Sequence, residues 1–170
     1  MRVFGISGWR NSGKTTLLVR LVRHFNAAGL RVSTVKHAHH GFDLDRPGKD
    51  SYRHRAAGAR EVLVSAAGRW ALLRELPEAE EPPLRILLER LEAVDLVLVE
   101  GFKRDPHPKL QVVRAARDAR LPADDAGHVV AFAATEPDLV TALAGRRPVF
   151  ALDDVPAIAA FALEQARPLD

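Results

Sequence analysis

Apolar residues along the chain occur in two kinds of segment that follow one another, one with the spacing typical of strands and one with the spacing typical of helices. Short apolar or alternating runs, the pattern of strands, occupy residues 2–7, 30–37, 61–65, 69–74, 94–101, 109–114, 128–133 and 148–151. Helical spacing, or a segment bounded by helix start and stop signals, occurs at residues 16–25, 50–58, 84–91, 137–143 and 155–166. Most neighbouring strands are separated by a helix, which predicts parallel pairing. We therefore expect an α/β fold with three layers, in which helices flank a mostly parallel twisted sheet of about seven or eight strands.

One pair of predicted strands is close enough in the sequence to form a hairpin. Only a short turn joins residues 61–65 to residues 69–74, so we expect this pair to form an antiparallel edge. Two polar stretches, at residues 38–49 and 77–83, predict loops. The first is long for a compact domain, and such loops are usually functional.

A phosphate-binding motif lies between the first strand and the first helix. Residues 8–15 read Gly-Trp-Arg-Asn-Ser-Gly-Lys-Thr, which fits the P-loop pattern of glycine, four residues, glycine, lysine and threonine. Backbone N–H groups of such a loop face a bound phosphate, together with the N-terminus of the helix. A glycine-rich turn that merely joins a strand to a helix is the alternative, but it would not need Lys14 and Thr15. The sequence therefore predicts a P-loop NTPase fold with a nucleotide site.

Each residue type in this motif has an expected role. Lys14 reaches the outer phosphates and is a candidate catalytic residue, and Thr15 offers its hydroxyl to Mg²⁺. The residues expected to contact the nucleotide are Gly8, Arg10, Asn11, Ser12, Gly13, Lys14, Thr15 and Thr16.

Three acidic residues outside the motif are candidates for the same site. Glu100 ends an apolar strand and could hold Mg²⁺ directly or through water, or be a solvated residue at a strand end. Asp50 could be a catalytic residue that contacts Mg²⁺ or orders an attacking water, or it could serve only as a helix N-cap. Glu136 could accept hydrogen bonds from guanine, or belong to a helix start with Thr135 as the N-cap.

Basic side chains follow two of the predicted strands. The second strand leads into a histidine cluster made of His37, His39 and His40. A metal ion, a phosphate, a partner or a second subunit could contact these histidines. Lys103 and Arg104 follow the strand at residues 94–101, where they could meet a phosphorylated second substrate or an acidic partner, or belong to a solvated loop.

Composition narrows the class of protein. With 170 residues, of which 47% are hydrophobic and 28% charged, the chain is expected to form one domain over residues 1–170. The net charge of +3 is spread among acids and only 6% of residues are aromatic, which argues against a nucleic-acid partner. The absence of cysteine excludes disulfides and thiolate ligands. Because neither a leader pattern nor an apolar run of membrane length occurs, we expect a cytoplasmic protein with no membrane partner.

Several of these segments together resemble one known family. The chain is similar to the molybdopterin-guanine dinucleotide biosynthesis protein B (MobB) family over residues 8–16, 35–59, 95–103 and 109–114. The most specific parts are the histidine-rich run at residues 34–52 and Val-Glu-Gly-Phe-Lys at residues 99–103. A P-loop alone would not single out this family.

The resemblance implies a GTP-binding protein that depends on Mg²⁺, forms a homodimer and hydrolyses GTP weakly. It also implies an accessory role in molybdenum cofactor biosynthesis, in which the protein assists the MobA-type guanylyltransferase that attaches GMP to molybdopterin. The residues themselves leave two alternatives open. One is a small-molecule kinase or ligase with Lys103 and Arg104 on the acceptor, and the other is a metallochaperone GTPase that uses the histidine cluster.

Overall fold

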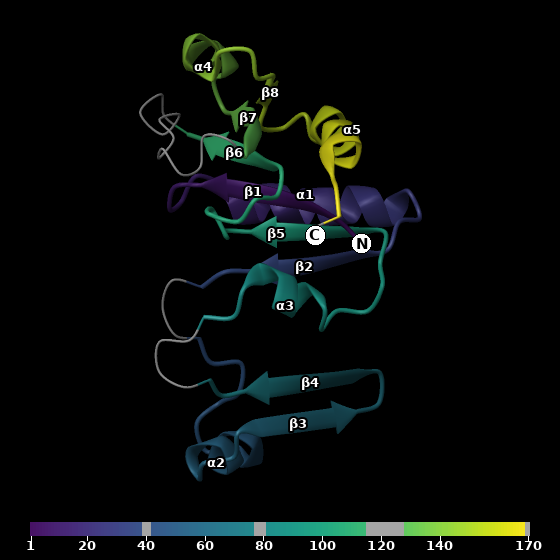
Figure 1. Ribbon diagram of the computed structural model, residues 1–170, viewed down its shortest axis with the longest axis vertical. Coiled ribbons are helices and arrows are strands. Elements are labelled where there is room, and N and C mark those ends of the chain that lie inside the picture. The colour runs from purple at the N-terminus through teal and green to yellow at the C-terminus, as the bar shows by residue number, and fades with distance from the viewer. Residues whose placement is uncertain (39–41, 77–80, 115–127, 169–170) are drawn as a thin grey trace. The chain divides into compact units, whose positions relative to one another are not determined.

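The chain forms two compact units. The computed structural model describes residues 1–38, 42–76, 81–114 and 128–168. We call residues Met1–His37 together with Leu84–Asp170 the sheet unit, and residues Ala38–Pro83 the hairpin unit (Figure 1). The hairpin unit is therefore an insertion between two parts of the sheet unit, and the expectation of a single domain stays a prediction.

The sheet unit is built on a parallel sheet of six strands in the order β2-β5-β1-β6-β7-β8 (Figure 1). Every neighbouring pair in this order is parallel. The strands are β1 (Arg2–Gly8), β2 (Val32–Lys36), β5 (Leu96–Glu100), β6 (Lys109–Val113), β7 (Val129–Ala134) and β8 (Val149–Ala151). This arrangement confirms the predicted mostly parallel α/β sheet and puts the strand before the P-loop motif at the centre. The sheet has six strands instead of the seven or eight expected, because the predicted strands at residues 61–65 and 69–74 do not join it.

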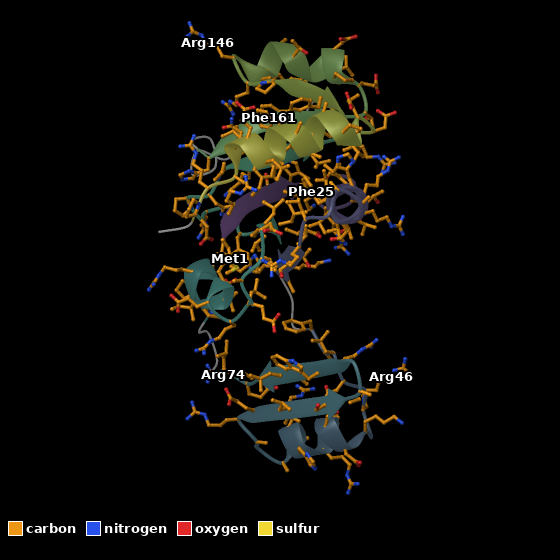
Figure 2. All side chains as sticks on the ribbon, turned by 90° about the vertical axis from the view of Figure 1, so that its right-hand side faces the viewer. Met1, Phe25, Arg46, Arg74, Arg146 and Phe161 are labelled. Carbon is orange, nitrogen blue, oxygen red and sulfur yellow. The ribbon has the colours of Figure 1, made fainter. Side chains whose placement is uncertain are left out.

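Helices cover both faces of this sheet because alternate strand residues point to opposite sides. The helices are α1 (Lys14–Ala27), α3 (Leu84–Leu88), α4 (Pro137–Ala144) and α5 (Val155–Gln165). Phe4 and Ile6 of β1 pack in one layer with α1 and α5, to which Phe25 and Phe161 belong (Figure 2). Val3 packs on the opposite face with α3, and α4 covers the outer strands on that face. The predicted three layers are thus confirmed.

The hairpin unit contains α2 (Asp50–Ala56), β3 (Glu61–Ala66) and β4 (Arg69–Arg74). The expected antiparallel pair forms, but the prediction that it is an edge of the main sheet is wrong, because it is a separate two-stranded sheet. Arg55 ties this unit together by donating to Asp43 at 2.6 Å, Asp45 at 2.9 Å and Glu75 at 3.1 Å. The hydrogen bond to Asp45, with those to Glu75 and Asp43, raises the pKa of Arg55.

Two predicted helix caps are displaced by one residue. Lys49 is the N-cap of α2, so Asp50 lies in the first turn, and Glu136 rather than Thr135 is the N-cap position of α4. The described residues 42–49 form neither helix nor strand, as expected for a loop. Parts of the predicted loops, at residues 39–41 and 77–80, lie outside the described residues.

A helix able to cross a bilayer would have to be longer and more apolar than any in the described part of the chain.

A buried histidine stands next to the central strand. His107 is 1% exposed, and neither ring nitrogen has a hydrogen-bond partner among the described residues. The ring approaches β1 so closely that a Cβ at Gly5 would come 2.5 Å from Nε2, which is why that position needs glycine. Burial lowers the pKa of His107 to about 3, and the charges of Lys109 and His128 add to this effect. The fold therefore requires a neutral imidazole.

This requirement predicts acid sensitivity that can be assigned to one side chain. Below the unfolded pKa of 6.5 the unfolded chain binds a proton at His107 that the folded chain does not bind, so stability falls as the pH falls. Between pH 7 and pH 5 this group alone should remove about 2 kcal/mol from the free energy of unfolding.

His107→Gln keeps a neutral polar side chain and should make that pH-dependent loss smaller by the same amount, whatever its effect on stability at pH 7. Urea unfolding of both proteins at the two pH values measures the difference. Parallel pH profiles for the two proteins would contradict the assignment.

Candidate functional site

The loop that joins β1 to α1 adopts the backbone conformation that its glycines permit. Gly8, Asn11 and Gly13 have positive φ angles of 145°, 60° and 102°. A Cβ at Gly8 would lie 2.6 Å from the carbonyl oxygen of Val112, so the loop leaves the sheet in close contact with β6. Arg114 fixes the other side of the loop by donating from Nη1 to the carbonyl oxygen of Asn11 at 3.2 Å. The predicted P-loop is therefore formed and anchored to the neighbouring strand.

The start of α1 is suited to an anion. Its N-cap is Gly13, no side chain caps it, and its first turn contains no acidic residue. The first N–H groups of a helix have no intrahelical acceptor and carry partial positive charge, so they attract a phosphate. In addition, the Ser12 hydroxyl is buried, with Oγ lacking a hydrogen-bond partner among the described residues. A phosphate oxygen would satisfy both groups.

Lys14 lies at the mouth of this loop. Its Nζ donates to the carbonyl oxygen of Trp9 at 2.6 Å, so the ammonium is folded back over the loop. Burial lowers the pKa of Lys14, the Glu100 carboxylate raises it, and the ammonium groups of Lys103 and Lys36 lower it. The predicted phosphate-binding lysine thus stands in a group of several charges.

Glu100 and Thr15 form the pair that the sequence predicts for Mg²⁺. In the β1–β5 register Glu100 stands beside Ile6, at the same end of the sheet as the loop. The hydroxyl of Thr15 lies 3.1 Å and 3.2 Å from the two carboxylate oxygens of Glu100, and Lys36 Nζ lies 3.8 Å from one of them. Glu100 is buried. Mg²⁺ prefers oxygen ligands, and this pair offers a carboxylate and a hydroxyl. The described residues contain no group of three or more His, Cys, Asp or Glu side chains that could hold a metal ion, so further ligands would have to come from elsewhere.

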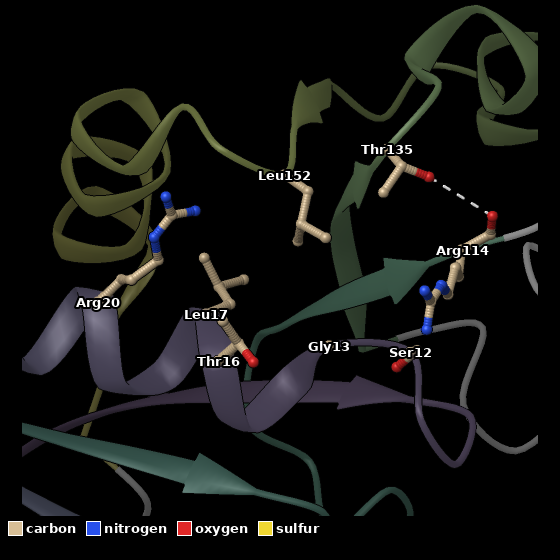
Figure 3. Close-up of a pocket in the computed structure, with 8 residues that line it drawn as sticks. All are labelled: Ser12, Gly13, Thr16, Leu17, Arg20, Arg114, Thr135 and Leu152. Atoms are coloured by element: carbon tan, nitrogen blue, oxygen red, sulfur yellow. Dashed lines mark hydrogen bonds between the residues drawn. The ribbon is translucent and has the colours of Figure 1, made fainter.

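A cavity of about 260 Å³ opens on the other side of the loop (Figure 3). Its lining residues are Ser12, Gly13, Thr16, Leu17, Arg20, Arg114, Thr135 and Leu152. Thr135 Oγ1 donates to the carbonyl oxygen of Arg114 at 3.5 Å (Figure 3). Sequence reasoning missed Leu17, Arg20, Arg114, Thr135 and Leu152. Three of them directly follow the carboxyl ends of β6, β7 and β8, where ligands bind in parallel sheets, and this position is the signal that could have found them.

The strand order separates the two sides of the site. Glu100 ends β5, which pairs with one edge of β1, whereas Arg114 and Thr135 follow β6 and β7 on the other side of β1. A ligand whose phosphates lie on the loop would therefore have its metal-binding end toward β5 and its other end toward the cavity.

The sequence also predicts two further carboxylates for this site. Glu136 is exposed and is not a lining residue of the cavity. Asp50 belongs to the hairpin unit, where its carboxylate lies 4.0 Å from Arg53. Arg10 is exposed on the loop itself. The roles given to these residues stay predictions.

The histidine cluster is described only in part. The ring of His37 packs against Phe102 with the ring centroids 4.9 Å apart. His39 and His40 lie outside the described residues, and the metal role proposed for the cluster therefore also stays a prediction.

Comparison with known proteins agrees with the fold and the loop. Residues 3–135 match the family model described as molybdopterin guanine dinucleotide synthesis protein B. The chain is 41% identical to the molybdopterin-guanine dinucleotide biosynthesis adapter protein of Escherichia coli (strain K12), over 74% of this chain and 68% of that protein. It is 32% identical to the probable adapter protein of the same name from Bacillus subtilis (strain 168), over 95% of this chain and 91% of the relative.

A solved structure extends the similarity to three dimensions. The crystal structure of molybdopterin-guanine biosynthesis protein B is similar with a TM-score of 0.75 and 28% identity, covering 95% of this chain and 98% of that one. The range matched by the family model spans the loop and Glu100, and the structural similarity covers nearly the whole chain. This chain belongs to the molybdopterin guanine dinucleotide synthesis protein B (MobB) family.

Proposed function

We propose that this protein is a GTP-binding adapter of molybdopterin-guanine dinucleotide biosynthesis, and at most a slow GTPase. One observation carries the proposal: an uncapped helix start and the buried, unpartnered hydroxyl of Ser12 stand next to the Thr15–Glu100 pair. This combination offers donors to a polyphosphate and oxygen ligands to its counter-ion. The family and the names of the relatives supply the biosynthetic pathway.

The proposed nucleotide has a defined direction. Its phosphates lie on residues 8–16, and Thr15 and Glu100 hold Mg²⁺, with Asp50 as a further candidate ligand. Bound Mg²⁺ would neutralise part of the triphosphate charge. The nucleoside lies toward the cavity on the β6 side, whose volume of about 260 Å³ suits part of a ligand rather than a whole one.

Guanine is favoured over adenine by the donors around the cavity. Arg20 and Arg114 are lining residues, and arginine donates readily to the O6 and N7 acceptors of guanine. In place of the O6 acceptor adenine has an amino group, and this group is itself a hydrogen-bond donor that an arginine cannot donate to. Glu136 stays the proposed acceptor for the guanine N–H groups on the sequence argument alone.

The remaining parts of the proposal concern partners and rate. An adapter in this pathway would assist the MobA-type guanylyltransferase, with molybdopterin as a further partner, and would act as a cytoplasmic homodimer. Hydrolysis should be slow because no described residue is identified as a water-positioning glutamine or an arginine finger. Lys14 and Asp50 are the residues to which we assign any residual catalysis.

Replacing Lys14 tests the phosphate site. Lys14→Ala removes the loop ammonium and should weaken GTP binding by about 100-fold or more, because hydrogen bonds to charged groups contribute roughly 1.5–3 kcal/mol each. The fold should stay intact, since the side chain is only half-buried. Titration calorimetry gives the affinity, and thermal unfolding checks the fold.

Arg23→Ala is the matched control for this experiment. It removes one positive charge from an exposed position of the same helix and outside the cavity lining, and should leave GTP binding unchanged. Equal GTP affinity in the Lys14→Ala variant and the wild type would contradict the proposed site.

Replacing Glu100 tests the Mg²⁺ site. Mg²⁺ should strengthen GTP binding by the wild-type chain, and Glu100→Gln should reduce that enhancement by about tenfold or more because the amide is a poorer ligand than the carboxylate. The measurement is the ratio of GTP affinities with Mg²⁺ and with EDTA. Glu164→Gln, at an exposed position of α5, should keep the wild-type ratio. An undiminished ratio in Glu100→Gln would remove Glu100 from the metal site.

A further inference from the structure

Positive charge is concentrated on the β5 side of the loop. The ammonium groups of Lys36 and Lys103 are close enough to Lys14 to lower its pKa, and Glu100 is the carboxylate that acts in the opposite direction. Because like charges repel, holding these side chains together has a free-energy cost that a multivalent anion would recover. Lys36 is already paired with Glu100 at 3.8 Å. The position of the Lys103 ammonium near Lys14 therefore needs a separate explanation.

Trp9 holds Lys103 and Lys14 at the same place. Its carbonyl oxygen accepts the hydrogen bond from Lys14 at 2.6 Å, and Lys103 Nζ lies 5.0 Å from the centroid of its ring. Trp9 is 46% exposed, and a cation–π contact at an exposed site is weak. A phosphate could thus take the ammonium of Lys103 from the ring at little cost.

A buried lysine holds the backbone of the loop that carries Lys103. Lys109 is fully buried, and its Nζ donates to the carbonyl oxygens of Phe102 at 3.1 Å, Lys103 at 2.5 Å and Asp105 at 2.9 Å. Phe102 has a φ of 45°, which is unfavourable for a residue with a side chain, and packs on His37. Such a conformation persists only when the surroundings hold it, and strained residues cluster at functional sites. The Lys103 backbone is therefore pre-positioned.

We propose that Lys103 binds the terminal phosphate of a nucleoside triphosphate and thereby makes the site discriminate triphosphate from diphosphate. The inference rests on the proposed nucleotide function and adds a residue to it. Lys103 follows β5, on the side of Thr15 and Glu100, whereas the cavity for the nucleoside is on the β6 side. Lys109 is a positioning residue, which acts by holding the backbone of Lys103.

The first test compares affinities for the β,γ-imido analogue of GTP and for GDP, both with Mg²⁺. Lys103→Met should weaken binding of the triphosphate analogue by about 10-fold to 100-fold and change GDP binding less than about twofold, since only the terminal contact is lost. Lys103→Arg should restore most of the preference. Arg104→Met is the matched control, because it removes a charge from the exposed neighbouring position, and it should behave as the wild type.

The second test follows the ring of Trp9 directly. The chain contains two tryptophans, at positions 9 and 70, so Trp70→Phe leaves Trp9 as the only indole reporter. In that background the triphosphate analogue should change the Trp9 emission as the ammonium of Lys103 leaves the ring, and GDP should change it much less. Adding Lys103→Met should remove the difference between the two nucleotides. Adding Lys109→Met in place of Lys103→Met should reduce that difference, because the Lys109 ammonium holds the backbone of Lys103.

The outcomes separate this inference from the proposed function. Loss of the triphosphate preference in Lys103→Met with intact GDP binding supports the inference. An unchanged preference, while the wild type binds guanine nucleotides, overturns it and leaves the proposed function standing. Equal losses for both nucleotides also overturn it, because Lys103 would then act on the loop as a whole. If the wild type binds neither nucleotide, both the proposed function and the inference fail.

Discussion

Parallel pairing of β1 with strands on both sides is the constraint on which the site depends. The register places Glu100 beside Ile6 and Val112 beside Gly8, so an acid from β5 and the backbone of β6 meet the loop at one end of the sheet. Side chains alternate between the faces of a strand, and a slip of one residue would turn Glu100 to the opposite face, away from Thr15. The apolar packing of β1 and β5 on both faces makes such a slip costly. Packing of the core therefore determines how Glu100 and the loop are placed relative to one another.

A buried carboxylate is tolerated here because its neighbours satisfy it. Glu100 is 9% exposed, accepts a hydrogen bond from Thr15 and is paired with Lys36. An isolated ionised carboxylate at this depth would be strongly destabilising. The same arrangement leaves the surroundings with more positive than negative charge, since Lys14 and Lys103 are also nearby. The electrostatics of this edge thus favour a polyanion over a neutral ligand.

Sequence patterns predicted the local features and missed those that depend on contacts between distant segments. The P-loop around Lys14 and the acid at Glu100 could be read from strand length, motif and position, and the structure brings both to one place. The hairpin was misassigned to the main sheet because an apolar alternating pair does not reveal which strand it will join. The cavity lining by Arg114 and the burial of Lys109 also escaped prediction. Each follows from the strand order, which no local pattern specifies.

In the proposed function the P-loop motif would explain the binding of a phosphate, but not how the number of phosphates is recognised. Backbone N–H groups hold the phosphates within the loop and Lys14 reaches toward the outer ones, so an additional contact specific to the terminal phosphate requires a second cation beyond the loop. Lys103 fulfils that condition because the buried ammonium of Lys109 fixes its backbone while the partly exposed Trp9 ring holds its side chain only weakly. A rigid support and a weak resting contact together allow the charge to move without rearranging the core.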